Sequence, residues 1–98
     1  MPSKYPTYLF GTKFQESSHG VVLIPLDKVE ATNLIVADAN AQIQVVKADY
    51  RAGRISAPEA DLRIRRIRVH AYLELGKLGG FSTRQKLDIM RRVEGSEL

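Results

Sequence analysis

The side chains that most often perform chemistry are few in this sequence. Its two histidines, His19 and His70, are far apart, and it contains no cysteine. A metal site needs several ligands at short spacing, and neither histidine stands in such a spacing. Ser17 and Ser18 precede His19, but no acidic residue can be identified that would orient this histidine for nucleophilic catalysis. We predict no catalytic residue and no bound metal.

Motifs that bind phosphate or cofactors are also missing from the sequence. The segment Lys77–Gly80 is rich in glycine, but no predicted strand precedes it, and it lacks the lysine–serine pair of a phosphate-binding loop. We find no nucleophile elbow and no dinucleotide fingerprint. A polar seam of Asn33, Asn40 and Gln44 favours a small-ligand sensor, although such a seam is more typical of a hydrated helix face. We predict a protein that is not an enzyme, with no cofactor and no small-molecule ligand.

Arginine is the residue type best suited here to recognise a charged partner. Four arginines alternate with apolar residues in one short stretch, Arg63, Arg65, Arg66 and Arg68. Their guanidinium groups can form a basic ridge that contacts phosphates or an acidic protein surface. They can instead be a hydrated flank, with stems that cover apolar surface and with Arg65 and Arg66 paired to Asp61 and Glu59. We favour the hydrated flank.

The segment Ala71–Val93 has the order of a helix-turn-helix DNA reader, with Gly79 and Gly80 in the turn. Three features favour a simple capping helix instead: the preceding helix is longer than this motif needs, Asp88 can pair with nearby arginines, and an apolar face suits a lid on the longer helices. That face comprises Leu87, Ile89, Met90 and Val93, and the expected partners of Asp88 are Arg84 and Arg92. If nucleic acid or an acidic partner binds, we expect the contacts to be Arg63, Arg66, Thr83, Arg84, Arg91 and Arg92.

The elements that position these residues form one domain over residues 1–98, mainly α with a small β part. Thr7–Phe14 and His19–Leu26 are rich in β-branched and aromatic residues around a polar turn, so we predict a β-hairpin over residues 7–26. A three-helix region is expected over residues 27–93, followed by a tail at 94–98. The strand hairpin can pair with a partner strand or with a second copy of the chain.

Three helices are expected from capping residues and glycines. The first begins at Asp27 as its N-cap and ends at Gly53. The second begins at Ser56, with Pro58 in its first turn and Glu59 bonding back to complete a capping box, and it ends at Leu78. The third covers Thr83 to about Val93, where Ser82 and Gln85 form a second capping box. The short link between the two long helices makes them antiparallel neighbours.

Each long helix carries two apolar stripes on nearly opposite sides, and a simple helical pair needs only one. The first stripes are Val29, Thr32, Val36, Ala39, Ile43, Val46 and Tyr50, and then Ile64, Ile67, Ala71, Leu75 and Leu78. The third helix and the strands can cover only part of the second stripes. We therefore predict a homo-oligomer, most simply a dimer that forms a four-helix bundle through a two-fold axis. The predicted interface residues are Leu34, Ala41 and Val45 with Leu62, Val69 and Leu73.

The bulk composition allows several functions and excludes few. A formal net charge of +4 and an isoelectric point near 9.6 permit nucleic-acid binding without requiring it. No apolar run suits a membrane span, and the opening MPSKYPTYLF lacks a signal-peptide core, so we expect a cytoplasmic protein. We predict a non-catalytic interaction protein, such as an adaptor, regulator or inhibitor, that binds a macromolecular partner. The alternative is a nucleic-acid-binding regulator, and a protein partner is the favoured one.

Overall fold

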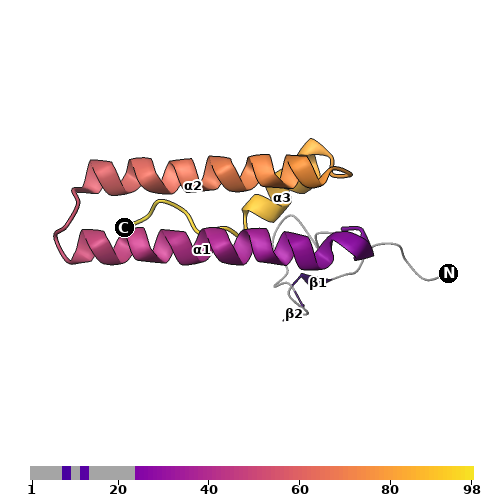
Figure 1. The fold of residues 1–98 in the computed structure, drawn as a ribbon, viewed down its shortest axis with the longest axis horizontal. Coiled ribbons are helices and arrows are strands. Elements are labelled where there is room, and N and C mark those ends of the chain that lie inside the picture. Colours follow the sequence, from indigo (N-terminus) through magenta and orange to yellow (C-terminus); the bar gives the residue numbers. More distant parts are fainter. Residues whose placement is uncertain (1–7, 10–11, 14–23) are drawn as a thin grey trace.

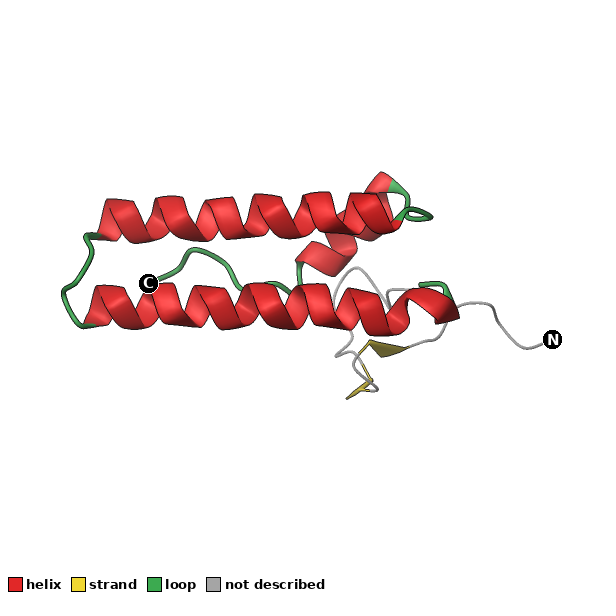
Figure 2. Cartoon of the chain, in the orientation of Figure 1, coloured by secondary structure: helices red, strands yellow, loops and turns green. Residues whose placement is uncertain are grey.

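The computed structural model describes residues 8–9, 12–13 and 24–98, and these are mainly α-helical (Figure 1). A 3-10 helix, η1 (Leu26–Lys28), leads into α1 (Val29–Arg51), which is followed by α2 (Ala57–Leu78) and α3 (Thr83–Met90). The two long helices lie side by side and antiparallel, joined at one end by residues 52–56 (Figure 2). The mainly α architecture is therefore as predicted.

The predicted β-hairpin falls largely outside the described residues. A pairing of two residues on each side joins β1 (Tyr8–Leu9) antiparallel to β2 (Thr12–Lys13). Both of these lie inside the first predicted strand, so they do not test its pairing with the second. At the described end of the second predicted strand, Ile24 and Pro25 have no regular structure and Leu26 begins η1. The prediction of a strand reaching Leu26 is therefore wrong at that end.

The start of α1 differs from the prediction, whereas its end agrees with it. Asp27 lies inside η1, and Lys28 is the N-cap of α1 without any side-chain cap. At the other end, Gly53 has φ = 75°, which only glycine adopts readily. Its amide donates to the Tyr50 carbonyl, and the Arg54 amide donates to the Asp49 carbonyl, at 3.0 and 2.9 Å. These two bonds form a Schellman motif that ends the helix.

Serine caps start both later helices at the predicted residues. The hydroxyl of Ser56 accepts a hydrogen bond from the Glu59 amide at 3.2 Å. The predicted return bond from Glu59 is replaced, because its carboxylate accepts from Arg63 instead. At α3 the full capping box is present, with Gln85 amide to Ser82 hydroxyl at 3.1 Å and Ser82 amide to Gln85 side chain at 2.8 Å.

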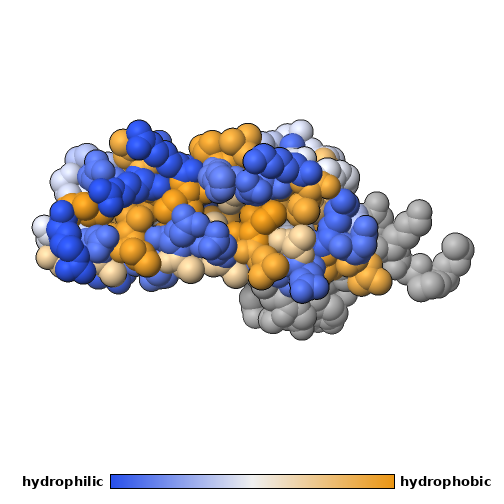
Figure 3. All heavy atoms as spheres, viewed as in Figure 1, coloured by the Kyte–Doolittle hydropathy of each residue, from blue (hydrophilic) through white to orange (hydrophobic). Residues whose placement is uncertain are grey.

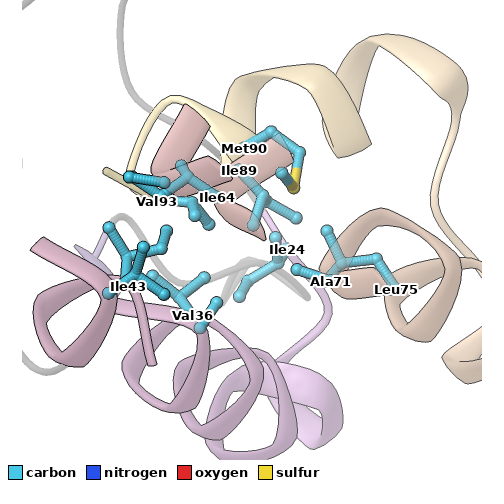
Figure 4. Packing of buried hydrophobic residues seen from close by; sticks show 12 residues of the cluster. Ile24, Val36, Ile43, Ile64, Ala71, Leu75, Ile89, Met90 and Val93 are labelled. Atoms are coloured by element: carbon cyan, nitrogen blue, oxygen red, sulfur yellow. The ribbon is translucent and has the colours of Figure 1, made fainter. Parts of the chain in front are cut away.

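One apolar core joins α1, α2, α3 and the residues at either end of them (Figure 4). The first stripe of α1 is confirmed in this core, with Thr32 fully buried and with Val29 and Tyr50 partly buried against it. The first stripe of α2 is confirmed except for Leu78, which is not part of the cluster. Ile24 enters from before η1, and Ile89, Met90 and Val93 enter from the other end of the chain. The fully or nearly fully buried apolar residues are Ile24, Val36, Ala39, Ile43, Val46, Ala60, Ile64, Ala71, Leu75, Ile89, Met90 and Val93.

Two lysines fasten the ends of α2 and α3. The ammonium group of Lys28 donates to the Leu78 carbonyl at 3.0 Å, at the C-terminus of α2, where the helix dipole favours a cation. Lys86 of α3 lies over the ring of Tyr72 of α2, with its nitrogen 4.8 Å from the ring centre. Both contacts hold neighbouring elements against the end of the helical pair.

Candidate interaction surface

All six residues predicted for the oligomer interface are exposed in the single chain. Among the larger side chains, Leu34 is 64% exposed, Val45 61%, Val69 59%, Leu73 56% and Leu62 44%. Large aliphatic side chains are usually buried, so exposure of five of them on two helices is unusual for an isolated domain. The space-filling view shows apolar side chains at the surface along both long helices, between hydrophilic ones (Figure 3). The structure therefore leaves the second stripes uncovered.

These exposed residues form two stripes rather than one. Successive residues turn about 100° around a helix, so a position two residues from a core residue lies on nearly the opposite side. Ala41 and Val45 stand two residues on either side of Ile43, which is buried between the helices. In the same way, Leu73 stands between Ala71 and Leu75, which are both buried.

Each long helix therefore presents one exposed apolar stripe on nearly the opposite side from its own buried stripe. We call Leu34, Ala41 and Val45 the α1 edge, and Leu62, Val69 and Leu73 the α2 edge. Leu34 and Asp38 of α1 also line the groove between the long helices, together with Ile67 and His70 of α2.

The α2 edge borders a shallow hollow of about 370 Å³. Val69 and Leu73 supply its apolar wall, and Arg65, Arg66 and His70 line the rest. A second, larger groove of about 520 Å³ lies between the long helices, where Ile35 and Ile67 meet polar side chains. His70 belongs to both and lies 3.5 Å from Glu74. Across residues 24–98 and the two short strands, no group of three or more histidine or acidic side chains could hold a metal ion.

Most of the basic residues on α2 already have acidic or backbone partners. Arg63 contacts Glu59 at 2.9 Å, and Arg65 contacts Asp61 at 2.8 Å, both one helical turn apart. The Asp61 pairing was predicted, whereas the predicted partner of Glu59 was Arg66, two turns away. Side chains four residues apart on a helix lie close enough for direct contact, and side chains seven residues apart do not. Arg66 is exposed, and the structure gives it no ion pair among the described residues.

The predicted contacts around α3 are dispersed. Asp88 pairs with Arg91 at 2.6 Å, a partner that the sequence did not predict. Burial lowers the pKa of Arg92, partly offset by the nearby Asp88 carboxylate. Thr83 and Arg84 are exposed at the start of the helix, and Leu87 of the predicted lid face is also exposed, at 51%. The six residues expected to contact nucleic acid therefore lie on different elements, and three of them have other partners.

The polar seam on α1 holds a segment of the same chain. Residues 91–98 follow α3 and run along the two long helices (Figure 1). The Asn40 side chain donates to the Arg92 carbonyl at 3.1 Å and accepts from the Glu94 amide at 2.7 Å. Gln44 donates to the Glu94 carboxylate, and Lys47 lies 3.4 Å from it. The hydrogen bond from Gln44 lowers the pKa of Glu94, and Lys47 adds to this effect.

Arg68 of α2 binds the same segment. We call the contacts of Asn40, Gln44, Lys47 and Arg68 with residues 92–94 the clasp. Its guanidinium donates to the Val93 carbonyl at 2.8 Å and to the Glu94 carbonyl at 2.7 Å. The prediction of Arg68 as part of a hydrated coat is therefore wrong, and residue 94, at the start of the predicted tail, is held by these contacts. Sequence reasoning missed the clasp because its partners are more than fifty residues apart from Asn40 and lie on another element. The polar seam of Asn33, Asn40 and Gln44, beside the buried stripe of α1, was the only feature of the sequence that could have indicated these contacts.

Comparison with protein-family models, curated proteins and solved structures finds no match to this chain. Among the described residues, no helix combines the length and apolar character that a membrane crossing requires.

Proposed function

We propose that this chain is a non-catalytic interaction protein whose first partner is another copy of itself. The α1 and α2 edges carry the proposal, because they leave five large aliphatic side chains exposed on an otherwise complete helical core. Full burial of one such side chain contributes roughly 1.5–3 kcal/mol. Covering either edge with another helix therefore supplies a substantial driving force for association. The resulting assembly would act as an adaptor, regulator or inhibitor towards a further macromolecule.

Substitution of Leu73 by aspartate tests the proposal. We expect Leu73→Asp to lower the native mass of the protein, because a charge buried inside the contact cannot be hydrated. The control is Leu87→Asp, which makes the same chemical change at a similarly exposed residue outside both edges. Light scattering after size-exclusion chromatography, over a range of protein concentrations, gives the mass of each variant.

Two results would contradict the proposal. A wild-type chain that is monomeric at every concentration would show that the protein does not self-associate. A Leu73→Asp variant with the wild-type mass would show that the α2 edge is not used. The nucleic-acid alternative now depends on Arg66 and Arg84, which are exposed. Binding of duplex DNA that weakens steeply between about 50 and 200 mM salt would favour that alternative.

A further inference from the structure

The two edges have the same spacing along their helices. The α1 edge runs through Leu34, Ala41 and Val45, with Asp38 inside it, so the steps are four, three and four residues. The α2 edge runs through Leu62, Val69 and Leu73, with Arg66 inside it, so its steps are again four, three and four residues. Spacing that alternates three and four is the pattern of a helix seam that packs against another helix. The edges are therefore matched in length and in layer positions.

Their polar positions carry opposite charges. Asp38 occupies the second position of the α1 edge, and Arg66 occupies the second position of the α2 edge. Both side chains are exposed. Asp38 accepts a hydrogen bond from Gln42 at 2.9 Å, and the described part of the chain supplies neither Asp38 nor Arg66 with an ion-pair partner. Glu30 adds a second exposed carboxylate one turn before Leu34 on α1.

A contact between two copies of the same edge, which we call a like contact, differs in electrostatic energy from a contact between an α1 edge and an α2 edge, which we call an unlike contact. When two α2 edges pack together, Arg66 of one copy lies opposite Arg66 of the other if the helices are parallel, and one layer away if they are antiparallel. Two α1 edges bring the two Asp38 side chains together in the same way. Like charges inside an apolar contact are strongly unfavourable. An α2 edge on an α1 edge places Arg66 opposite Asp38 when the helices are parallel, and one layer away when they are antiparallel. The unlike contact alone brings opposite charges together.

The sizes of the apolar side chains also differ between the two edges. The third position is Ala41 on α1 and Val69 on α2, and α1 has further exposed alanines beside its edge, Ala37, Ala48 and Ala52. Small side chains allow another helix to approach closely, and larger ones on that helix then fill the space. The α2 edge has the larger set, with two leucines and a valine.

We infer that the α2 edge of one copy packs on the α1 edge of the next copy, with Arg66 paired to Asp38 across the contact. This inference rests on the proposed self-association and specifies its geometry. Each copy carries both edges, so it can use one towards each of two neighbours. A head-to-tail contact of this kind forms a ring when its rotation closes and an open filament when it does not. The two-fold dimer expected from the sequence is the alternative geometry.

Two variants with complementary blocked edges test this geometry. Val45→Asp blocks the α1 edge and leaves the α2 edge intact, whereas Leu73→Asp does the reverse. Each variant alone is expected to be monomeric in light scattering. An equimolar mixture is expected to form a complex with the mass of two chains, because the intact α2 edge of the first variant binds the intact α1 edge of the second. Circular dichroism of each variant checks that its helix content is unchanged.

The outcomes separate this inference from the proposed function. If Val45→Asp keeps the wild-type mass, or if the mixture stays monomeric while the wild type assembles, unlike-edge packing is wrong and self-association stands. If the wild type is itself monomeric, the proposed function fails first. Leu87→Asp alone serves as the control, since both of its edges are intact and it should assemble as the wild type does.

Charge reversal supplies a second, independent measurement. Arg66→Asp and Asp38→Arg each place like charges across the inferred contact, so each is expected to weaken self-association at least about tenfold. The double variant, Asp38→Arg with Arg66→Asp, restores opposite charges and is expected to recover most of the wild-type affinity. A double variant no better than the worse single variant would overturn the pairing of these two residues.

Discussion

Thr32 is the only polar residue in the described part of the buried core, and its hydroxyl has no hydrogen-bond partner there. Its side chain is fully buried on the face of α1 that meets α2. A buried hydroxyl without a partner loses its hydration and gains nothing in return. Replacing it with a methyl group of the same shape removes that cost and keeps the packing.

Thr32→Val is therefore expected to stabilise the protein by about 1 kcal/mol. Urea unfolding measures this as a higher midpoint with an unchanged slope. Thr83→Val is the matched control, because Thr83 is exposed and should show no comparable gain. A midpoint for Thr32→Val at or below that of the wild type would mean that the hydroxyl has a stabilising role.

Glu94 gives the protein a pH dependence at the residue scale. Its pKa is lowered in the folded chain, chiefly by the hydrogen bond from Gln44 and also by Lys47. A carboxyl with a lower pKa in the folded state contributes stability above its unfolded pKa and loses it as the pH falls through the folded value. Acidification from about pH 6 to pH 3 should therefore destabilise the wild type partly through this residue.

Glu94→Gln tests this contribution. The variant is expected to lose less stability than the wild type over that pH range, measured by thermal unfolding at several pH values. Glu97→Gln is the control, since Glu97 is exposed in the same segment and has no ion pair with any described residue. Identical pH profiles for wild type and Glu94→Gln would contradict the assignment.

At the scale of elements, the clasp on residues 92–94 joins three parts of the fold. Asn40 of α1 and Arg68 of α2 both bind backbone groups of the segment that follows α3. These groups follow the last residue of α3, which ends at Met90 and not at Val93 as the sequence predicted. The side chains of α1 and α2 thus bind backbone groups that the end of a helix leaves without partners.

Asn40→Ala removes two of these bonds and leaves the Glu94 amide and the Arg92 carbonyl without this partner. We expect a loss of roughly 1–3 kcal/mol in the free energy of unfolding. Gln42→Ala on the same helix is the control, because Gln42 is exposed and its bond to Asp38 is on the surface, so a change within about 0.5 kcal/mol is expected. Equal effects of the two substitutions would show that the clasp contributes little.

At the scale of the whole molecule, local signals in the sequence predicted more than distant ones. Serine caps at Ser56 and Ser82 and the glycine at Gly53 fix three helix ends, since each acts within four residues of itself. The start of α1 was misplaced because Asp27 has the composition of an N-cap, while Pro25 begins a 3-10 turn ahead of it. Capping preferences do not distinguish a 3-10 turn from the first turn of an α-helix.

Which apolar residues are exposed on each long helix follows from the sequence, but how the two stripes are placed in space does not. Helical spacing identifies which side chains share a stripe, and the exposure of Leu34, Val45, Val69 and Leu73 agrees with that. Spacing within one helix does not show how two stripes on different helices face, because this depends on how α1 and α2 are rotated against each other. The partners of Arg68 and Asn40 were missed for a related reason, since both contacts join residues far apart in the sequence.

The core described above also determines when this chain can fold during its synthesis. Ile24 precedes the first helix and Ile89 lies near the end of the third, yet both are fully buried in the same cluster. The helical pair can form by local contacts soon after Ser56–Leu78 has been made, but its core stays open until residues 89–93 arrive. A ribosome paused before that point would hold a helical hairpin with its apolar side uncovered.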